Sequence, residues 1–291
     1  MKNKRMILGI VLGLGALPVV TVPILSAVGA RRSRRAYDRE KDELERRARS
    51  TEPVPPDRSA VDRLPEPVQK YLAATEALGK PPLRMAVLEQ TGSLRVAPDK
   101  PWMPFEAEQI YSMSPPGFLW LAEARLAPFV KMWARDRFVD GLGNMLVRLL
   151  GVLTVADGKG PTIDQGAALR FWGEVISFPE MVLDSHLSWQ PIDERHARLG
   201  IEHGELKLEA TVDFDEQGFP SAVHADRYRD VGGTPVLTAW SGHSRDWKAF
   251  GGRMFPSRWE SVWHLPEGDF SAVKIELLSV RTELDARDEP T

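Results

Sequence analysis

The sequence contains no cysteine among its 291 residues. This absence excludes disulfide bridges, thiolate metal sites and cysteine nucleophiles from any account of the fold or the chemistry. It does not identify a cellular compartment, because many exported bacterial domains also lack cysteine. Hydrophobic residues make up 43% of the chain and there are nine tryptophans, which is typical of a protein that folds around a core.

Motifs of the familiar enzyme classes are also missing. The chain has no HExxH zinc motif, no P-loop and no GxSxG turn, and Gly141-Leu142-Gly143 lacks the remainder of a dinucleotide fingerprint. The six histidines are scattered singly, without the spacing of metal ligands. We therefore predict no catalytic residues, no metal site and no cofactor, and we favour a protein that is not an enzyme.

No charged residue occurs from Met6 to Ala30. As a helix this run would be about 37 Å long, enough to cross a hydrocarbon core of about 30 Å. The sequence predicts a single-pass N-terminal transmembrane anchor over 1–30, with 6–30 in contact with the cell membrane. A cleaved signal peptide is the alternative, but the run is long for one and arginines, which retard export, follow it directly.

Charge is distributed unevenly along the chain. Basic residues on both sides of the apolar run leave open which side of the membrane carries the domain. Lys2, Lys4, Arg5 and the segment 31–49 contain twelve basic and five acidic residues, which leaves 26 basic against 36 acidic in 50–291. An acidic domain repels phosphate backbones, so we predict no nucleic-acid partner, and the sequence does not identify protein partners.

Three further regions follow the apolar run. Residues 31–57 predict a charged, solvated helical stalk that ends in the proline-rich linker TEPVPPD. Residues 58–285 predict a β-rich globular domain, and 286–291 a disordered tail. At the start of the domain, a short helix with Val68, Tyr71 and Leu72 on one side would dock onto the remainder.

From Leu83 onward apolar residues recur with a period of two, most clearly in ELKLEATVDF. Turns at 215–218 and 267–269 close hairpins. One interior helix, DQGAALRFWGEVISFP, has Asp164 as its expected N-cap and Pro179 as its end. The fold class is therefore mainly β (α+β), a long curled antiparallel sheet that forms an open or closed barrel, with one or two helices packed on it.

Seven phrases carry a resemblance to a known family: LPEPVQKYL, WMPFEAEQ, PPGFLWLA, RDRFVDGLGNM, LRFWGEVISFP, RYRDV and GGRMFP. Together they resemble a bacterial family of uncharacterised, membrane-anchored proteins, the domain of unknown function 6544, over most of 64–280. The resemblance implies no established activity. It implies a shape similar to the half-open barrels that carry lipoproteins or lipids across the bacterial periplasm, an analogy of fold alone.

Charged residues set among aromatic ones are the candidate binding residues: Asp136, Asp140, Arg170, Glu174 and Arg227. Inside a barrel mouth they would hold a ligand headgroup, or supply a carboxylate of raised pKa. The structural alternative is that arginine–carboxylate pairs tie a helix to the sheet and that Asp140-Gly141 forms a turn. Five tryptophans complete the candidate ligand-binding set, although tryptophans also fill large β cores: Trp120, Trp133, Trp172, Trp259 and Trp263.

These observations favour one function over two alternatives. The first is a membrane-anchored domain that binds an apolar or amphipathic ligand, such as a lipid, in a half-open barrel. The second is a structural or interaction protein with a solid barrel and no ligand. The third is a hydrolase without a familiar motif, which would require carboxylates such as Asp136 and Glu174 to meet in one cleft.

Overall fold

The structure is a computed structural model of the chain and describes residues 2–51, 58–127 and 130–282. In the first helix, side-chain environments are described from Pro23 onward. Helical segments are α1 (Lys2–Ser50), α2 (Arg58–Val61), α3 (Glu66–Ala74), η1 (Ala77–Gly79), α4 (Pro161–Val175) and η2 (Pro179–Leu183), of which η1 and η2 are 3-10 turns.

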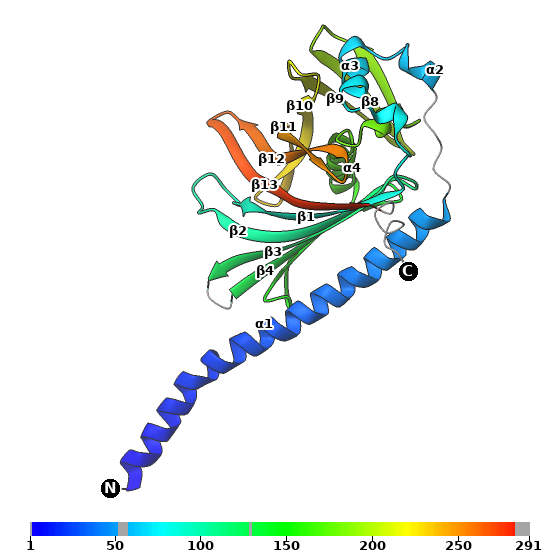
Figure 1. Ribbon diagram of the computed structural model, residues 1–291. Helices are drawn as coiled ribbons and strands as arrows, with labels where there is room; N and C mark the ends of the chain where they lie inside the picture. The colour runs from blue at the N-terminus through cyan, green and yellow to red at the C-terminus, as the bar shows by residue number, and fades with distance from the viewer. Residues whose placement is uncertain (1, 52–57, 128–129, 283–291) are drawn as a thin grey trace, which may run out of the picture.

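Strands in the described residues form one antiparallel sheet, which confirms the mainly β prediction (Figure 1). The first six are β1 (Met85–Leu94), β2 (Met103–Ser112), β3 (Gly117–Ala127), β4 (Val130–Val139), β5 (Leu142–Leu149) and β6 (Leu153–Gly158). The others are β7 (Leu187–Pro191), β8 (His196–His203), β9 (Leu206–Phe214), β10 (Pro220–Val231), β11 (Thr234–Phe250), β12 (Arg253–Leu265) and β13 (Gly268–Thr282).

The sheet is built from two meanders that meet at its centre. Its strand order is β6-β5-β4-β3-β2-β1-β13-β12-β11-β10-β9-β8-β7, so β1 pairs with β13 and the edge strands are β6 and β7. The chain between these two edges contains α4, and the sheet curls around that helix (Figure 1). The connection between the two edges therefore runs through the concave side of the sheet and occupies most of it.

The start of α4 differs from the sequence expectation. The helix begins at Pro161 with Gly160 at the N-cap position, not with Asp164. Proline is favoured in the first helical turn because it needs no hydrogen-bond acceptor there, and Gly160 has a φ of 98°, which suits glycine. Asp164 instead accepts a hydrogen bond of 2.7 Å from the backbone N–H of Gly143, which fixes α4 to β5.

The opposite side of α4 is attached to β10. Within the described strands, β9 pairs with β10 only from Pro220 to His224, so the remainder of β10 presents a free edge to the helix. Gln165 uses this edge, because its side chain donates to the carbonyl of Asp226 at 2.8 Å and accepts from the N–H of Tyr228 at 3.4 Å. An amide side chain thus replaces part of the missing ladder.

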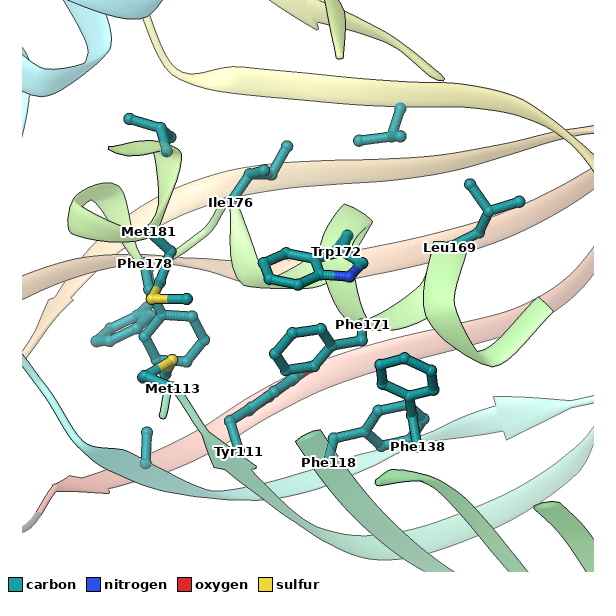
Figure 2. Packing of buried hydrophobic residues seen from close by; sticks show 14 of the residues in the cluster. Tyr111, Met113, Phe118, Phe138, Leu169, Phe171, Trp172, Ile176, Phe178 and Met181 are labelled. Carbon is teal, nitrogen blue, oxygen red and sulfur yellow. The ribbon is translucent and has the colours of Figure 1, made fainter. Parts of the chain in front are cut away.

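Aromatic side chains fill the space between α4 and the concave face (Figure 2). Phe171 and Trp172 of α4 are fully buried, and the Phe171 ring lies 5.8 Å from Phe138 and 6.3 Å from Tyr111. The predicted docking helix is confirmed at one end of this core, where Val68, Tyr71 and Leu72 of α3 are buried. The Tyr71 hydroxyl donates to the carbonyl of Ile176, just beyond α4, at 2.8 Å.

The convex face is covered by α1, which runs along the outside of β1–β4 (Figure 1). The charge pattern predicts a solvated stalk here, but Tyr37, Leu44 and Ala48 are buried against the sheet. These residues recur every four or seven positions and so share one face of the helix, although they are too few to give a strong pattern. This charged segment is helical, and one of its faces packs against the sheet.

A cluster of charges supports this packing. Lys41 donates to Glu108 of β2 at 2.8 Å, and Arg34 lies 3.3 Å from the same carboxylate. Burial opposes ionisation of Glu108, but Lys41 and Arg34 hold the pKa of its carboxyl below the usual range. The second half of α1 is therefore bound to the sheet by apolar and ionic contacts together.

No helix in the described part of the chain carries an apolar stretch long enough to cross a bilayer. Most of the predicted anchor falls on residues before Pro23, whose side chains lie outside the description, so the anchor stays a prediction. The linker at 52–57 and the tail at 286–291 also lie outside the described residues.

Replacing Leu44 by alanine tests the docking of α1. The change removes a side chain that is 3% exposed, so we expect the free energy of unfolding to fall by about 2–5 kcal/mol, measured by urea denaturation. Arg46→Ala is the control on the exposed face of the helix, with an expected effect within about 0.5 kcal/mol. Equal effects of the two substitutions would contradict the docking.

Candidate functional site

A buried ion pair joins α4 to the concave face of the sheet. Arg170 donates to Asp136 of β4 at 2.8 Å and to Glu174, one turn further along α4, at 3.0 Å. Its guanidinium lies 4.9 Å from the ring centres of both Phe118 and Trp120, in the range of a cation–π interaction. One arginine is thus held by two carboxylates and two aromatic rings.

Two glutamines and a tyrosine extend this network into the sheet. Gln109 of β2 donates to Glu174 at 2.9 Å and accepts from Arg170 at 3.3 Å. Gln90 donates to Gln109 at 3.2 Å and accepts from the Trp120 indole at 3.0 Å. The Tyr111 hydroxyl donates to the same oxygen of Glu174 that Gln109 contacts. Their polar atoms therefore find partners despite their burial, as such groups require.

The network shifts the ionisation of its members. Burial raises the pKa of Asp136, and the charge of Arg170 only partly offsets this. Burial by itself would lower the pKa of Arg170, but Glu174 and Asp136 raise it above the ordinary value. Burial, followed by the charge of Glu174, likewise raises the pKa of Tyr111. The raised pKa keeps Arg170 protonated.

Arg227 of β10 is a second guanidinium on the concave side. It donates to the carbonyl of Gly166 in α4 at 2.8 Å and lies 4.5 Å from the ring centre of Trp240 and 5.9 Å from that of Trp263. Its Nε is buried without a hydrogen-bond partner among the described residues. Burial lowers the pKa of Arg227 to about 10, because it outweighs the favourable charge of Asp136.

A hollow of about 60 Å³ lies between the end of α4 and strands β10–β13. Gly173, Glu174 and Ile176 line it on the helical side. Apolar and polar side chains line the strand side: Val223, Trp240, Trp259, Val273 and Ile275, together with His243, Ser244, Glu260 and Ser261. The carboxylate of Glu174 borders this space while it is engaged by Arg170, so the hollow joins an apolar wall to one end of the polar network.

The structure brings together most of the candidate residues. Asp136, Arg170, Glu174 and Trp120 form the network, Arg227 and Trp263 lie together beside it, and Trp259 lines the hollow. Trp172 is buried on another side of α4, with its ring 5.3 Å from that of His186.

Two candidates lie away from this group. Trp133 points to the convex face and packs in the cluster under α1. Asp140 occupies the β4–β5 turn with a φ of 56° and accepts from Arg47 of α1 at 2.9 Å. The turn interpretation of Asp140-Gly141 agrees with this placement. Neither Trp133 nor Asp140 reaches the concave side.

Sequence reasoning missed Gln90, Gln109, Tyr111 and Gly173. The available signal for the glutamines was polarity at an inward position, because Gln109 lies on the same face of β2 as the inward-facing Phe105, Ala107 and Tyr111. Gly173 gave no comparable signal, since a glycine inside a helix is not specific for any role.

Some of the scattered histidines also meet, on the neighbouring strands β11 and β12. The Ser241 hydroxyl lies 2.9 Å from Nε2 of His243 and 2.9 Å from Nε2 of His264, whose Nδ1 lies 2.8 Å from Asp269. The chain of contacts is similar to a nucleophilic triad, but Ser241 is fully buried in the middle of a paired strand. We therefore interpret these contacts as hydrogen bonds that connect neighbouring strands, without a catalytic role. No group of metal-binding side chains occurs within 2–51, 58–127 and 130–282.

The two carboxylates of the network do meet, as a hydrolase would require. Both are hydrogen bonded to Arg170, and Glu174 also accepts from Gln109 and Tyr111. Of these two carboxylates, only Glu174 borders the hollow. A general acid needs a proton that faces its substrate, so this arrangement favours a structural role for the carboxylates over a catalytic one.

The raised pKa of Asp136 predicts a pH-dependent stability. The contribution of Asp136 to the free energy of unfolding is fully present below the ordinary pKa of aspartate, about 3.9. This contribution is lost as the pH rises through the raised pKa of Asp136. The free energy of unfolding of the protein minus that of Asp136→Asn should therefore decrease as the pH rises, as measured by urea denaturation. Asp226→Asn, at an exposed position, controls for the substitution itself. A difference that increases with pH would contradict the assignment.

Solved structures that match this chain share little sequence with it. A putative outer membrane lipoprotein-sorting protein domain from Vibrio parahaemolyticus is 12% identical, with a TM-score of 0.42 over 77% of this chain and 93% of that chain. A LolA superfamily protein from Nitrosomonas europaea is 10% identical, with a TM-score of 0.39 and coverages of 72% and 91%. A DUF1329 family protein from Desulfovibrio piger is 14% identical, with a TM-score of 0.41 and coverages of 75% and 94%.

No curated protein matches the sequence. A family model does match, over residues 55–275, and these include the whole sheet up to the middle of β13 together with α3 and α4. The resemblance noted in the sequence is thereby confirmed, and the chain belongs to DUF6544, a family of unknown function.

Proposed function

We propose that the protein is a membrane-anchored binding domain that holds an apolar or amphipathic ligand, with lipid as the first candidate, between α4 and strands β10–β13. The observation that carries this proposal is the apolar hollow on the concave side, lined by Trp240, Trp259 and Ile275. Sites for small molecules are typically concave and apolar with a few polar groups at one end, and Glu174 supplies such a group here.

The size of the hollow defines how a ligand enters. Ligand pockets usually have volumes of roughly 300–1,000 Å³, whereas this space measures about 60 Å³. The proposal therefore treats this conformation as the closed form, from which binding requires the end of α4 to move away from β10–β13. Ile176 and Ser177, which connect α4 to η2, are buried, and the Tyr71 hydroxyl donates to the carbonyl of Ile176, so this movement has to break that contact.

The anchor places this hollow beside a bilayer. Its support is the charge-free run from Met6 to Ala30, and α1 continues from that run without a break onto the outside of the sheet. A ligand that leaves the membrane would then travel only a short distance to the concave side. The side of the membrane stays open.

Gly173 offers a direct test, because it lines the hollow and lies on α4. A methyl group there would meet Val223 at 3.6 Å, an ordinary contact, so Gly173→Ala keeps the hollow and improves helix propensity. A leucine would fill the space. We expect full-length wild type and Gly173→Ala, extracted in mild detergent, to carry a co-purifying lipid in native mass spectrometry, and Gly173→Leu to lose most of it.

The pair of substitutions separates bound ligand from lipid that surrounds the anchor, since the anchor is the same in all three proteins. Lipid extraction from each sample identifies the species retained. Equal lipid in all three proteins, or none in wild type, would contradict the proposal and favour the interaction-protein alternative.

A further inference from the structure

A second depression lies on the opposite face of the sheet, between α1 and strands β3–β6. Its volume is about 310 Å³, several times that of the concave hollow. Ser33, Tyr37 and Glu40 of α1 form one side. Trp133, Arg135 and Arg148 lie among the residues of the sheet that form the other side. We call this depression the outer groove.

Two of the lining side chains have buried donor groups that make no hydrogen bond in the described part of the chain. Trp133 is 8% exposed, and its indole Nε1 is buried with no hydrogen-bond partner among the described residues. Nη1 of Arg135 on the same strand also makes no hydrogen bond within these residues, although it lies 3.5 Å from the carboxylate of Glu40 in an ion pair, and Nη2 donates to Asn144. A buried N–H without an acceptor is costly in free energy, so such groups mark places where an acceptor is expected.

The positive charge of the outer groove is incompletely balanced. Arg148 stands directly opposite Trp133 in the β4–β5 register and makes no ion pair or hydrogen bond within the described residues. The carboxylate of Glu40 lies 3.5 Å from Arg135 but is shared with Arg137, also at 3.5 Å. Burial lowers the pKa of Arg135 in spite of Glu40.

The other carboxylate of the outer groove is already engaged. Asp157 lies 3.0 Å from Lys159 and accepts from Asn144 at 2.8 Å. The groove therefore combines the unpartnered indole N–H of Trp133 and the guanidinium of Arg148 with carboxylates that have other partners. Leu121 and Leu146 add an apolar wall beside these donors.

We propose that the outer groove binds a phosphate group, with Trp133 and Arg135 as hydrogen-bond donors and Arg148 as the pairing cation. Guanidinium groups match the geometry of phosphate oxygens and form strong charge-assisted hydrogen bonds with them. The phosphate belongs to a lipid headgroup or to a free phosphate ion, and the experiment distinguishes these sources. A ligand here would contact both α1 and the sheet and so strengthen their association.

The test uses the full-length protein in an uncharged detergent. Inorganic phosphate, short-chain phosphatidic acid and the diacylglycerol with the same chains are titrated separately, and the indole N–H signal of Trp133 is followed by NMR. Trp133→Phe identifies that signal. We expect phosphatidic acid to shift it and diacylglycerol to leave it unchanged. If inorganic phosphate also shifts the Trp133 signal to saturation, the free phosphate ion is sufficient for binding. If only phosphatidic acid shifts the signal, the ligand is a lipid headgroup.

Arg148→Gln should weaken phosphate binding by about tenfold or more, because it removes the pairing cation. Arg148→Lys should restore part of the affinity. Arg198→Gln, at an exposed position of β8, is the matched control and should bind as wild type does. The thermal unfolding midpoint of each variant confirms that it folds. An unshifted Trp133 signal with both phosphate ligands, equal binding by Arg148→Gln and Arg198→Gln, or equal binding of diacylglycerol would overturn the proposal.

Discussion

The chain has to connect the two edges of its own sheet, and this connection passes through the concave side. Every later feature of the interior depends on that constraint. Because α4 lies where a barrel would be hollow, its side chains become the core, and Arg170 enters the interior with its charge. The charge demands partners, which Asp136 and Glu174 supply. The small space that remains near Trp240 is what the helix leaves unfilled.

The wall formed by β1–β5 is covered on both faces, by α4 inside and by α1 outside. This explains why residues 117–122 of β3 are buried without interruption although the strand is antiparallel. Alternation of polar and apolar residues distinguishes the two faces of a strand only where one face is exposed to solvent. Period-two analysis therefore located the strands here but gave no means of distinguishing the inner from the outer face.

The limits of the sequence analysis follow from that point. The hairpin around 215–218 was predicted because β9 has a clear alternation and a glycine turn. Arg170 and Glu174 were grouped as charged residues set among aromatic ones, and the helix brings them together because residues four positions apart share one face. Trp133 was assigned to the same side as Trp120, which only the strand register contradicts. The contact between Gln109 and Glu174 joins residues 65 positions apart, and local pattern contains no information about it.

The pairing at the centre of the sheet has a consequence for biosynthesis. Ala86 of β1 pairs with Thr282 of β13, so the two meanders can join only after nearly the whole chain has been made. Until then β1 is an unpaired edge, which is prone to association with other chains. Local hairpins form early in each half, and closure between distant segments comes last and slowly. The order of synthesis thus makes the C-terminal strand the element that protects the nascent protein from aggregation.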